Sequence, residues 1–186
     1  MPLRSDEELM EAVKKGDFKA FSILFNRYSQ KISNLSFRFS GQKDFAEEIV
    51  QETFIRIWEK ADLFKKGYRF SSWIYRIALN LCINQQKETN IFQSLNINDD
   101  IEIELPAGEK DISEQLIIKE EYEMLQAALM KLPDKQRMAL LLAREEGYSY
   151  IEIGKLLGLS ISSVESLIYR ARKKLIEMLS GKIEGL

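Results

Sequence analysis

The stretch from Tyr150 to Tyr169, YIEIGKLLGLSISSVESLIY, has the spacing of two short helices joined by a tight turn. Gly154 lies where two helices must approach closely, and Gly158 supplies the left-handed conformation that a residue with a Cβ disfavours. Apolar residues recur where such a pair needs them, at Ile153, Leu157, Leu159, Val164 and Leu167. The pattern therefore predicts a helix-turn-helix motif over 150–169.

The second helix of this motif carries mainly hydroxyl and basic side chains. They are Ser160, Ser162, Ser163, Glu165, Ser166, Tyr169, Arg170, Arg172, Lys173 and Lys174. Short hydroxyls at a helix start can bond phosphates or base edges, and a helix N-terminus favours phosphate. A basic cluster alone is more typical of a solvated helix face, and an ordinary core hairpin gives a similar apolar pattern. On a helix-turn-helix the cluster indicates duplex DNA, with Glu165 either accepting from cytosine N4 or staying away from the DNA.

The rest of the chain also has helical periodicity. Ser5 and Glu8 have the spacing of an N-terminal capping box, and Gly16-Asp17 and Gly41 mark breaks. Further helices are expected over 44–61, 71–87 and 112–132, and from Pro133-Asp134. The first apolar series comprises Leu9, Val13, Phe21, Leu24, Phe25, Tyr28, Ile32, Leu35 and Phe39. No segment alternates with period two, so the sequence predicts an all-α fold.

The composition changes at Glu88. Residues 88–111 hold seven acids and one base, are rich in Asn, and show no helical stripe. Such a segment cannot bury enough apolar surface to offset its ordering entropy. The sequence therefore predicts a helical domain over 1–90, an acidic flexible linker over 91–111 and a second helical domain over 112–186.

An acidic and amide stripe follows one face of the helix expected from residue 44. It comprises Asp44, Glu48, Gln51, Glu52 and Glu59. Phe45, Ile49, Ile57 and Trp58 can serve the buried side, while Phe54 and Ile55 adjoin the stripe as exposed apolar residues. Acidic stripes are usually solvated helix faces. The amide and the apolar neighbours favour a protein partner here.

The next segment has the opposite charge. Residues 60–87 carry six Lys or Arg (Lys60, Lys65, Lys66, Arg69, Arg76 and Lys87) against Asp62, a net charge of +5. Phe64, Tyr68, Phe70, Trp73 and Tyr75 are interleaved with them. Bases stack on rings while basic side chains follow the backbone, so the pattern suits single-stranded nucleic acid. Trp73 is expected in the core. For Phe64 and Tyr68 the sequence does not distinguish a core position from a contact with nucleic acid.

Composition excludes several classes of function. There is no histidine, and one cysteine, Cys82, allows neither an internal disulfide nor a cysteine cluster. The longest apolar run, Met138 to Ala143, is too short to span a bilayer, and residues 1–10 have no signal-peptide core. We expect a cytoplasmic protein that is not an enzyme, with no cofactor, metal, small-molecule substrate or membrane insertion, and with Cys82 in the core.

Three runs together resemble a known family. They are AEEIVQETF at 46–54, FSSWIYRIALN at 70–80 and YRARKKL at 169–175. In this order and spacing they are similar to the extracytoplasmic-function sigma factors, the minimal group of the sigma-70 family. The likeness places sigma region two at about 5–90 and region four at about 112–180.

The resemblance implies that the chain is a promoter-specificity subunit of bacterial RNA polymerase. Region two would dock on the polymerase through Glu48, Gln51 and Glu52. It would also melt the minus-ten element and hold a flipped base near Phe64, the Lys65–Ser71 loop and Asn80. Region four would read the minus-thirty-five duplex, and the acidic linker would follow the RNA exit path. Many members are basic at the positions of Glu165 and Leu167.

Two other classes of protein compete with this interpretation. A helix-turn-helix regulator that never joins polymerase explains 112–180 but not the acidic stripe or the basic aromatic segment. An adaptor or anti-sigma protein would bind other proteins only. The sequence leaves open whether an anti-sigma factor is a further partner, and which promoter is recognised.

Overall fold

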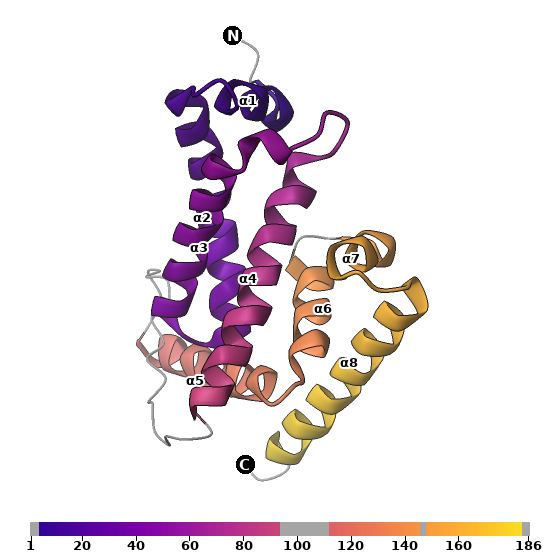
Figure 1. Ribbon diagram of the computed structural model, residues 1–186. Coiled ribbons are helices and arrows are strands. Elements are labelled where there is room, and N and C mark those ends of the chain that lie inside the picture. Colours follow the sequence, from indigo (N-terminus) through magenta and orange to yellow (C-terminus); the bar gives the residue numbers. More distant parts are fainter. Residues whose placement is uncertain (1–3, 94–111, 146–147, 184–186) are drawn as a thin grey trace. The chain divides into compact units, whose positions relative to one another are not determined.

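The computed structural model describes residues 4–93, 112–145 and 148–183, and every regular element in these ranges is a helix (Figure 1). The elements are α1 (Asp6–Val13), α2 (Phe18–Ser40), α3 (Lys43–Glu59), the single 3₁₀ turn η1 (Ala61–Leu63), α4 (Phe70–Gln93), α5 (Ile112–Met130), α6 (Asp134–Glu145), α7 (Tyr150–Leu157) and α8 (Ile161–Ile183). The all-α prediction is confirmed. Over the described ranges no helix combines the length and apolar character needed to cross a membrane.

The chain divides into two compact units. One comprises Met1–Phe37 and Lys43–Ile97, and the other comprises Arg38–Gln42 and Asn98–Leu186. Helix α4 continues to Gln93, six residues beyond the expected end. The expected linker therefore begins inside a helix, and its remaining residues, 94–111, lie outside the described ranges.

Local side-chain caps set where the first helices begin. The Glu8 N–H donates to Ser5 Oγ at 3.1 Å, and the Ser5 N–H donates to Glu8 Oε2 at 2.8 Å, as the predicted capping box requires. Two N–H groups of the first turn of α2 donate to Asp17 Oδ1 at 3.0 and 3.1 Å. Gly16 and Gly41 both have positive φ, at 83° and 76°, so the predicted breaks are confirmed.

Helices α1 to α4 supply the core of the first unit. The apolar series of α1 and α2 is buried there at Leu9, Val13, Leu24, Tyr28, Ile32 and Leu35, but Phe21 is half-buried and Phe25 is 38% exposed. Phe39, the last of the series, is also buried but belongs to the second unit. The rings of Phe21 and Phe25 lie against Phe54 of α3, at centroid distances of 5.9 and 4.7 Å. Phe54 is therefore buried rather than exposed, because two rings of α2 cover it.

Two further aromatic predictions on these helices need correction. The sequence pattern places Trp58 on the buried side of its helix, but Trp58 is 40% exposed, because it lies at the rim beside Phe18 and Phe21. Trp73, expected in the core, is half-buried.

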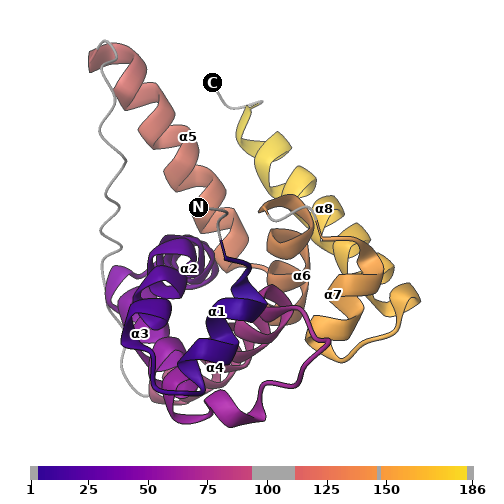
Figure 2. The same ribbon diagram turned by 90° about the horizontal axis from the view of Figure 1, so that it is seen from above.

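Helix α1 packs against the first turns of α4 (Figures 1 and 2). Its Asp6 carboxylate accepts from Arg27 Nη1 at 2.5 Å and from the Tyr28 hydroxyl, both on α2. Polar contacts from a single acid therefore connect the N-terminal helix to α2, while Leu9, Met10 and Val13 fill the core beneath it.

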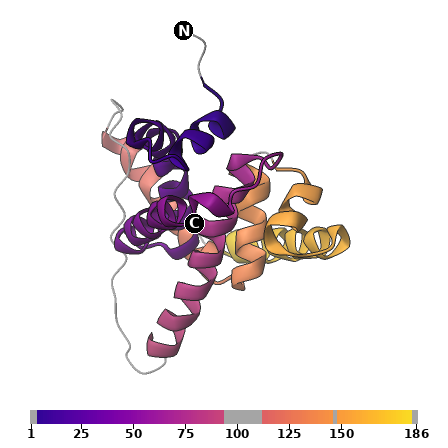
Figure 3. The ribbon, with the colours of Figure 1, turned by 45° about the horizontal axis from the view of Figure 1, so that its top comes forward.

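Helices α6, α7 and α8 pack pairwise, and α7 with the start of α8 forms the predicted helix-turn-helix (Figure 3, orange to yellow). Helix α7 begins with a second capping box, from Ser149 and Glu152, and ends at Gly158 with φ 68°. The Leu159 N–H donates to the Gly154 carbonyl at 2.9 Å, which closes the turn. A Cβ on Gly154 would lie 2.7 Å from the Leu159 oxygen, so this position requires glycine.

The buried face of the motif differs from the expected one. Leu156 and Ile168 are buried, whereas Leu157 and Leu167 are only half-buried. Helix α8 packs against α5 and α6 as well as α7, so three neighbours together set its inward side.

We expect Gly154→Ala to destabilise the second unit by about 1–3 kcal/mol, because the added methyl collides with turn backbone that cannot move independently. The temperature of thermal unfolding measures this loss. Lys155→Ala is the control, because Lys155 is an exposed residue of the same helix and its truncation leaves the core unchanged. An unfolding temperature for Gly154→Ala equal to that of the wild type would contradict the packing argument.

Candidate functional sites

The acidic stripe lies on an accessible side of α3. Asp44, Glu48, Gln51 and Ile55 are exposed and Glu52 is half-buried, and we call these five residues the α3 face. Arg56 Nε donates to Glu52 Oε1 at 2.6 Å, and the Gln85 amide of α4 donates to Glu48. Four of the five stripe residues therefore lie on this face together with the adjoining Ile55, and the fifth, Glu59, is exposed at the end of the helix.

An aromatic surface that the sequence analysis missed adjoins this face. Phe18 is 66% exposed, and its ring centroid lies 5.9 Å from that of Trp58. Contacts with Phe21 and then Phe54 extend the cluster to the half-exposed Phe25. The sequence does contain a signal for this surface. Phe18, Phe21 and Phe25 form one helical stripe, and Leu24, Tyr28, Ile32 and Leu35 form a second one. A helix with two apolar stripes can bury only one of them against its own core.

The basic segment forms an exposed turn over residues 65–69, which we call the basic turn. Lys65, Lys66, Tyr68 and Arg69 are exposed, with Tyr68 at 66%. Gly67 reverses the chain with φ 93°, and the Tyr68 N–H donates to the Lys65 carbonyl at 3.3 Å.

Phe64, just before the basic turn, is a core residue. It is 2% exposed, and its ring centroid lies 6.1 Å from that of Phe70 and 5.4 Å from that of Trp73. Lys14 Nζ lies 5.5 Å from the centroid of the same ring. Phe64 therefore supports the basic turn from beneath, whereas Tyr68 presents an accessible ring.

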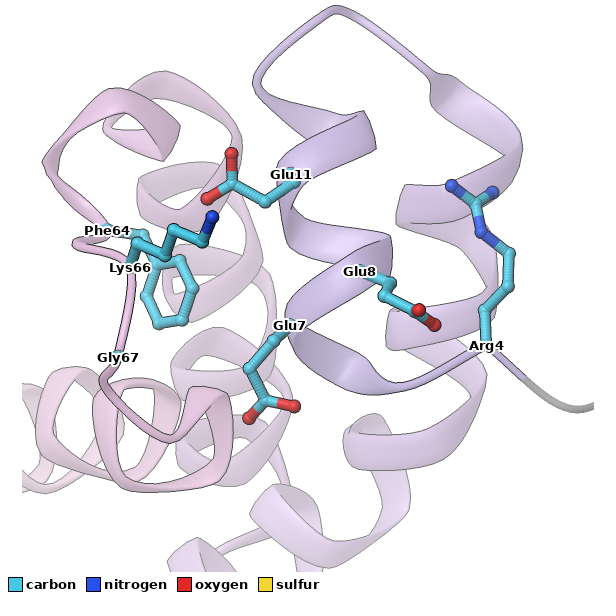
Figure 4. A pocket seen from close by; sticks show the side chains of 7 residues that line it. All are labelled: Arg4, Glu7, Glu8, Glu11, Phe64, Lys66 and Gly67. Carbon is cyan, nitrogen blue, oxygen red and sulfur yellow. The ribbon is translucent and has the colours of Figure 1, made fainter.

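A hollow of about 440 Å³ lies between α1 and the basic turn (Figure 4). It is lined by Arg4, Glu7, Glu8, Glu11, Phe64, Lys66 and Gly67. Arg76 and Asn80 are exposed on α4 and Ser71 is half-buried there, but none of these three lines the hollow. The structure thus groups part of the expected base pocket and leaves Asn80 outside this hollow.

The hollow has mixed charge. The Glu11 carboxylate accepts from Lys14 Nζ at 2.8 Å, and this hydrogen bond, with the charges of Lys14 and Lys66, lowers the pKa of Glu11. Figure 4 shows the Glu11 carboxylate and the Lys66 ammonium turned toward one another. Acidic side chains of α1 therefore compensate the charge of the basic turn on this side.

The outer side of α8 carries most of the residues expected to contact DNA. Ser162, Glu165, Ser166, Tyr169, Arg170, Arg172, Lys173 and Lys174 are exposed, and Ser163 is half-buried. Ser160 Oγ accepts from the Ser163 N–H at 3.2 Å and lies 2.7 Å from Ser163 Oγ, so Ser160 caps the helix. The sequence analysis also missed Ile161, which is exposed in the first turn of α8.

Two of the basic residues of α8 have partners in the protein. Lys174 Nζ donates to the Lys131 carbonyl beyond the end of α5 at 3.2 Å, and Lys173 Nζ lies 4.0 Å from Glu177. Arg170 and Arg172, both exposed, are therefore the basic side chains of α8 best placed to reach a ligand.

Cys82 lies in the core, as expected. It is fully buried beside Ser36, with 3.5 Å between the sulfur and the hydroxyl oxygen. Burial raises the pKa of the thiol to about 12, so the reactive thiolate is scarce at neutral pH. Over the described ranges no group of His, Cys, Asp and Glu side chains could hold a metal ion.

Two family models match the chain. "Sigma-70 region 2" matches residues 24–90, which include the α3 face and the basic turn, and "Sigma-70, region 4" matches residues 122–175, which include the helix-turn-helix.

Curated relatives match over nearly the whole chain. The ECF RNA polymerase sigma-E factor of Escherichia coli strain K12 is 34% identical over 98% of this chain and 96% of its own length. The ECF RNA polymerase sigma factor SigW of Bacillus subtilis strain 168 is 32% identical over 91% and 94%. Among solved structures, the sigma factor RpoE of Bartonella quintana, crystallised with the anti-sigma factor NepR, aligns with a TM-score of 0.67. It is 26% identical, over 88% of this chain and 97% of that one.

Proposed function

The chain belongs to the extracytoplasmic-function group of RNA polymerase sigma factors, and from this premise we propose how its parts divide the work of promoter recognition. As a sigma factor it binds polymerase core and promoter DNA and takes part in transcription initiation. The region 2 match sets aside a regulator that never joins polymerase.

The α3 face docks on polymerase. The observation that supports this assignment is that exposed carboxylates and the exposed Ile55 lie on one side of α3. The aromatic surface of Phe18 and Trp58 lies beside them. Protein interfaces typically combine an apolar centre that includes aromatic residues with a polar rim. The docking residues are then Asp44, Glu48, Gln51, Glu52 and Ile55, with Trp58 at the edge.

The basic turn and the exposed side of α4 hold the melted minus-ten strand. Lys65, Lys66, Arg69 and Arg76 offer positive charge to the backbone, and Tyr68 offers a ring on which a base can stack. Asn80 can donate to and accept from a base edge, with Ser71 as a further polar contact. Phe64 keeps the turn in place from the core.

Helix α8 reads the minus-thirty-five duplex. Arg170 can approach a guanine bidentately, while Arg172 and Lys173 contact phosphates. The side chains that face base edges are Glu165, Ser162, Ser163, Ser166 and Tyr169. Ser160 acts first as a helix cap, and Lys174 acts first as a donor to the Lys131 carbonyl.

The remaining expectations depend on this role. The domains are residues 1–90 and 112–186, with the acidic linker between them. We place the chain in the cytoplasm with the polymerase, and assign nucleotide addition to the polymerase rather than to this chain. Because a relative was crystallised with an anti-sigma factor, we propose an anti-sigma factor as a further partner.

Charge reversal on the α3 face should abolish binding to polymerase core. We expect Glu48→Lys with Glu52→Lys to leave no measurable association, because polymerase would face two repelling charges, while the unfolding temperature changes little. Titration of labelled chain with core enzyme measures the affinity. The control, Glu120→Lys with Glu121→Lys on exposed positions of α5, makes the same change in net charge. Wild-type affinity in the α3 double variant would remove this face from the interface.

Loss of the Asn80 amide should impair promoter melting. Asn80→Ala is expected to slow open-complex formation and to blur base preference at one minus-ten position, because a base-edge contact is worth about 1–3 kcal/mol. Permanganate reactivity and selection from a randomised minus-ten library measure both effects. Asn84→Ala, an exposed amide one turn further along α4, should behave as wild type. The assignment is wrong if every minus-ten preference survives in Asn80→Ala.

Two substitutions on α8 should separate base readout from backbone contact. Glu165→Gln is expected to change preference at a single minus-thirty-five base pair. Lys173→Ala should lower affinity for all duplexes and reduce the salt slope by about 1. Selection on randomised duplexes and a salt titration measure these effects. An unchanged consensus with uniformly tighter binding in Glu165→Gln would show that this carboxylate only repels the backbone.

A further inference from the structure

A side chain of α1 caps the start of α4. Glu7 Oε1 accepts from the Phe70 N–H at 3.0 Å, across 63 residues of sequence. Phe70 is the first residue of α4. The Trp73 N–H donates to the carbonyl of Arg69, the residue before the helix, at 3.2 Å. The first N–H groups of a helix have no intrahelical acceptor, and a carboxylate there also interacts favourably with the helix dipole. Glu7 therefore supplies the start of α4 with an acceptor that α1 provides.

The capped residue is also the end of the basic turn. Residues 65–69 lie between two buried rings, Phe64 and Phe70, which are packed against one another. Phe70 also contacts Tyr28 of α2, with ring centroids 5.3 Å apart. Apolar packing fixes where these rings lie, whereas the hydrogen bond from Phe70 to Glu7 fixes the direction of the peptide that joins the turn to α4. Figure 4 shows Glu7 on the side of α1 that faces the turn.

We infer that Glu7 is a positioning residue for promoter melting, because its bond to the Phe70 N–H holds the basic turn in register with the exposed side of α4. This inference rests on the proposed function. A melted strand must meet Lys65, Lys66 and Arg69 on the turn and also Arg76 and Asn80 on the helix. Small errors in position at such a site reduce rates disproportionately.

Charge alone offers a rival explanation. Glu7 lines the hollow with Glu8 and Glu11, so its removal also makes the surroundings of the basic turn more positive. Two substitutions separate the effects. Glu7→Gln removes the charge but keeps a carbonyl acceptor for the Phe70 N–H, whereas Glu11→Ala removes a charge facing Lys66 without touching the cap.

The experiment uses full-length chain assembled with polymerase core. The DNA probe is a promoter recovered with the wild-type holoenzyme from a randomised library, with 2-aminopurine in the minus-ten element to report unstacking. We expect Glu7→Ala to slow opening about tenfold, with core affinity and minus-thirty-five duplex binding unchanged. Glu7→Gln should restore opening to within about twofold of wild type, and Glu11→Ala should match wild type.

A spectroscopic measurement on the free chain tests the cap directly. In a Trp58→Phe background Trp73 is the remaining tryptophan, and it lies in the first turn of α4 beside Phe64. Its emission should shift in Glu7→Ala and return in Glu7→Gln.

Several outcomes would overturn the inference. Equal loss of opening in Glu7→Gln and Glu7→Ala would assign the effect to charge, and wild-type opening in Glu7→Ala would remove any role. If Glu7→Ala unfolds, Glu7→Met keeps the bulk without the acceptor; unfolding of both would make Glu7 a folding residue only. Asn80→Ala is run in parallel. Normal opening in that variant counts against the minus-ten site itself, whereas a defect there with none in Glu7→Ala counts against the positioning role alone.

Discussion

The unpaired N–H groups at the start of each helix are the constraint on which the described part of the chain depends. A helix leaves four such donors, and an acceptor there fixes the residue at which the helix begins. Ser5, Asp17, Ser149 and Ser160 supply acceptors from neighbouring sequence, while Glu7 supplies one from another helix. The starting residue therefore sets where the chain enters each helix, while the packing of neighbouring helices sets which side chains point inward.

Helix capping also limits which polar side chains remain for ligands. Ser160 belongs by spacing to the surface that would meet DNA, yet its hydroxyl accepts from the first turn of α8. The Lys174 ammonium likewise donates a hydrogen bond to a backbone carbonyl near the end of α5. Folding and recognition thus draw on the same short segments, and the residues that folding does not use, such as Glu165 and Arg170, are the better candidates for specificity.

Aromatic side chains divide between the core and the surface in a way that follows the charge. Phe64 and Phe70 are buried beneath a turn with three basic residues, whereas Phe18 and Trp58 are accessible beside the acidic α3 face. Under the proposed function, these buried rings would give the basic turn a rigid support for a single nucleic-acid strand. Accessible rings beside acids give α3 the mixture of apolar and polar surface that suits a protein partner.

Much of the protein was determined by sequence alone, because the signals are local. Helical periodicity, the Ser5 capping box and the breaks at Gly16 and Gly41 each depend on residues within a few positions of one another. Gly154 and Gly158 likewise fixed the turn of the helix-turn-helix, and three short runs identified the family. The α3 face could be predicted too, because a stripe on one helix needs no knowledge of its neighbours.

Only the tertiary structure decided how those helices meet, since periodicity gives a helix an apolar side but does not say how many neighbours share it. For this reason Leu156 and Ile168 are buried where the sequence predicted Leu157 and Leu167. Likewise Phe54 is buried and Trp58 is exposed, the reverse of the prediction. The bond from Phe70 to Glu7 joins residues 63 positions apart, and no local pattern marks it, because it exists only once α1 has packed against α4.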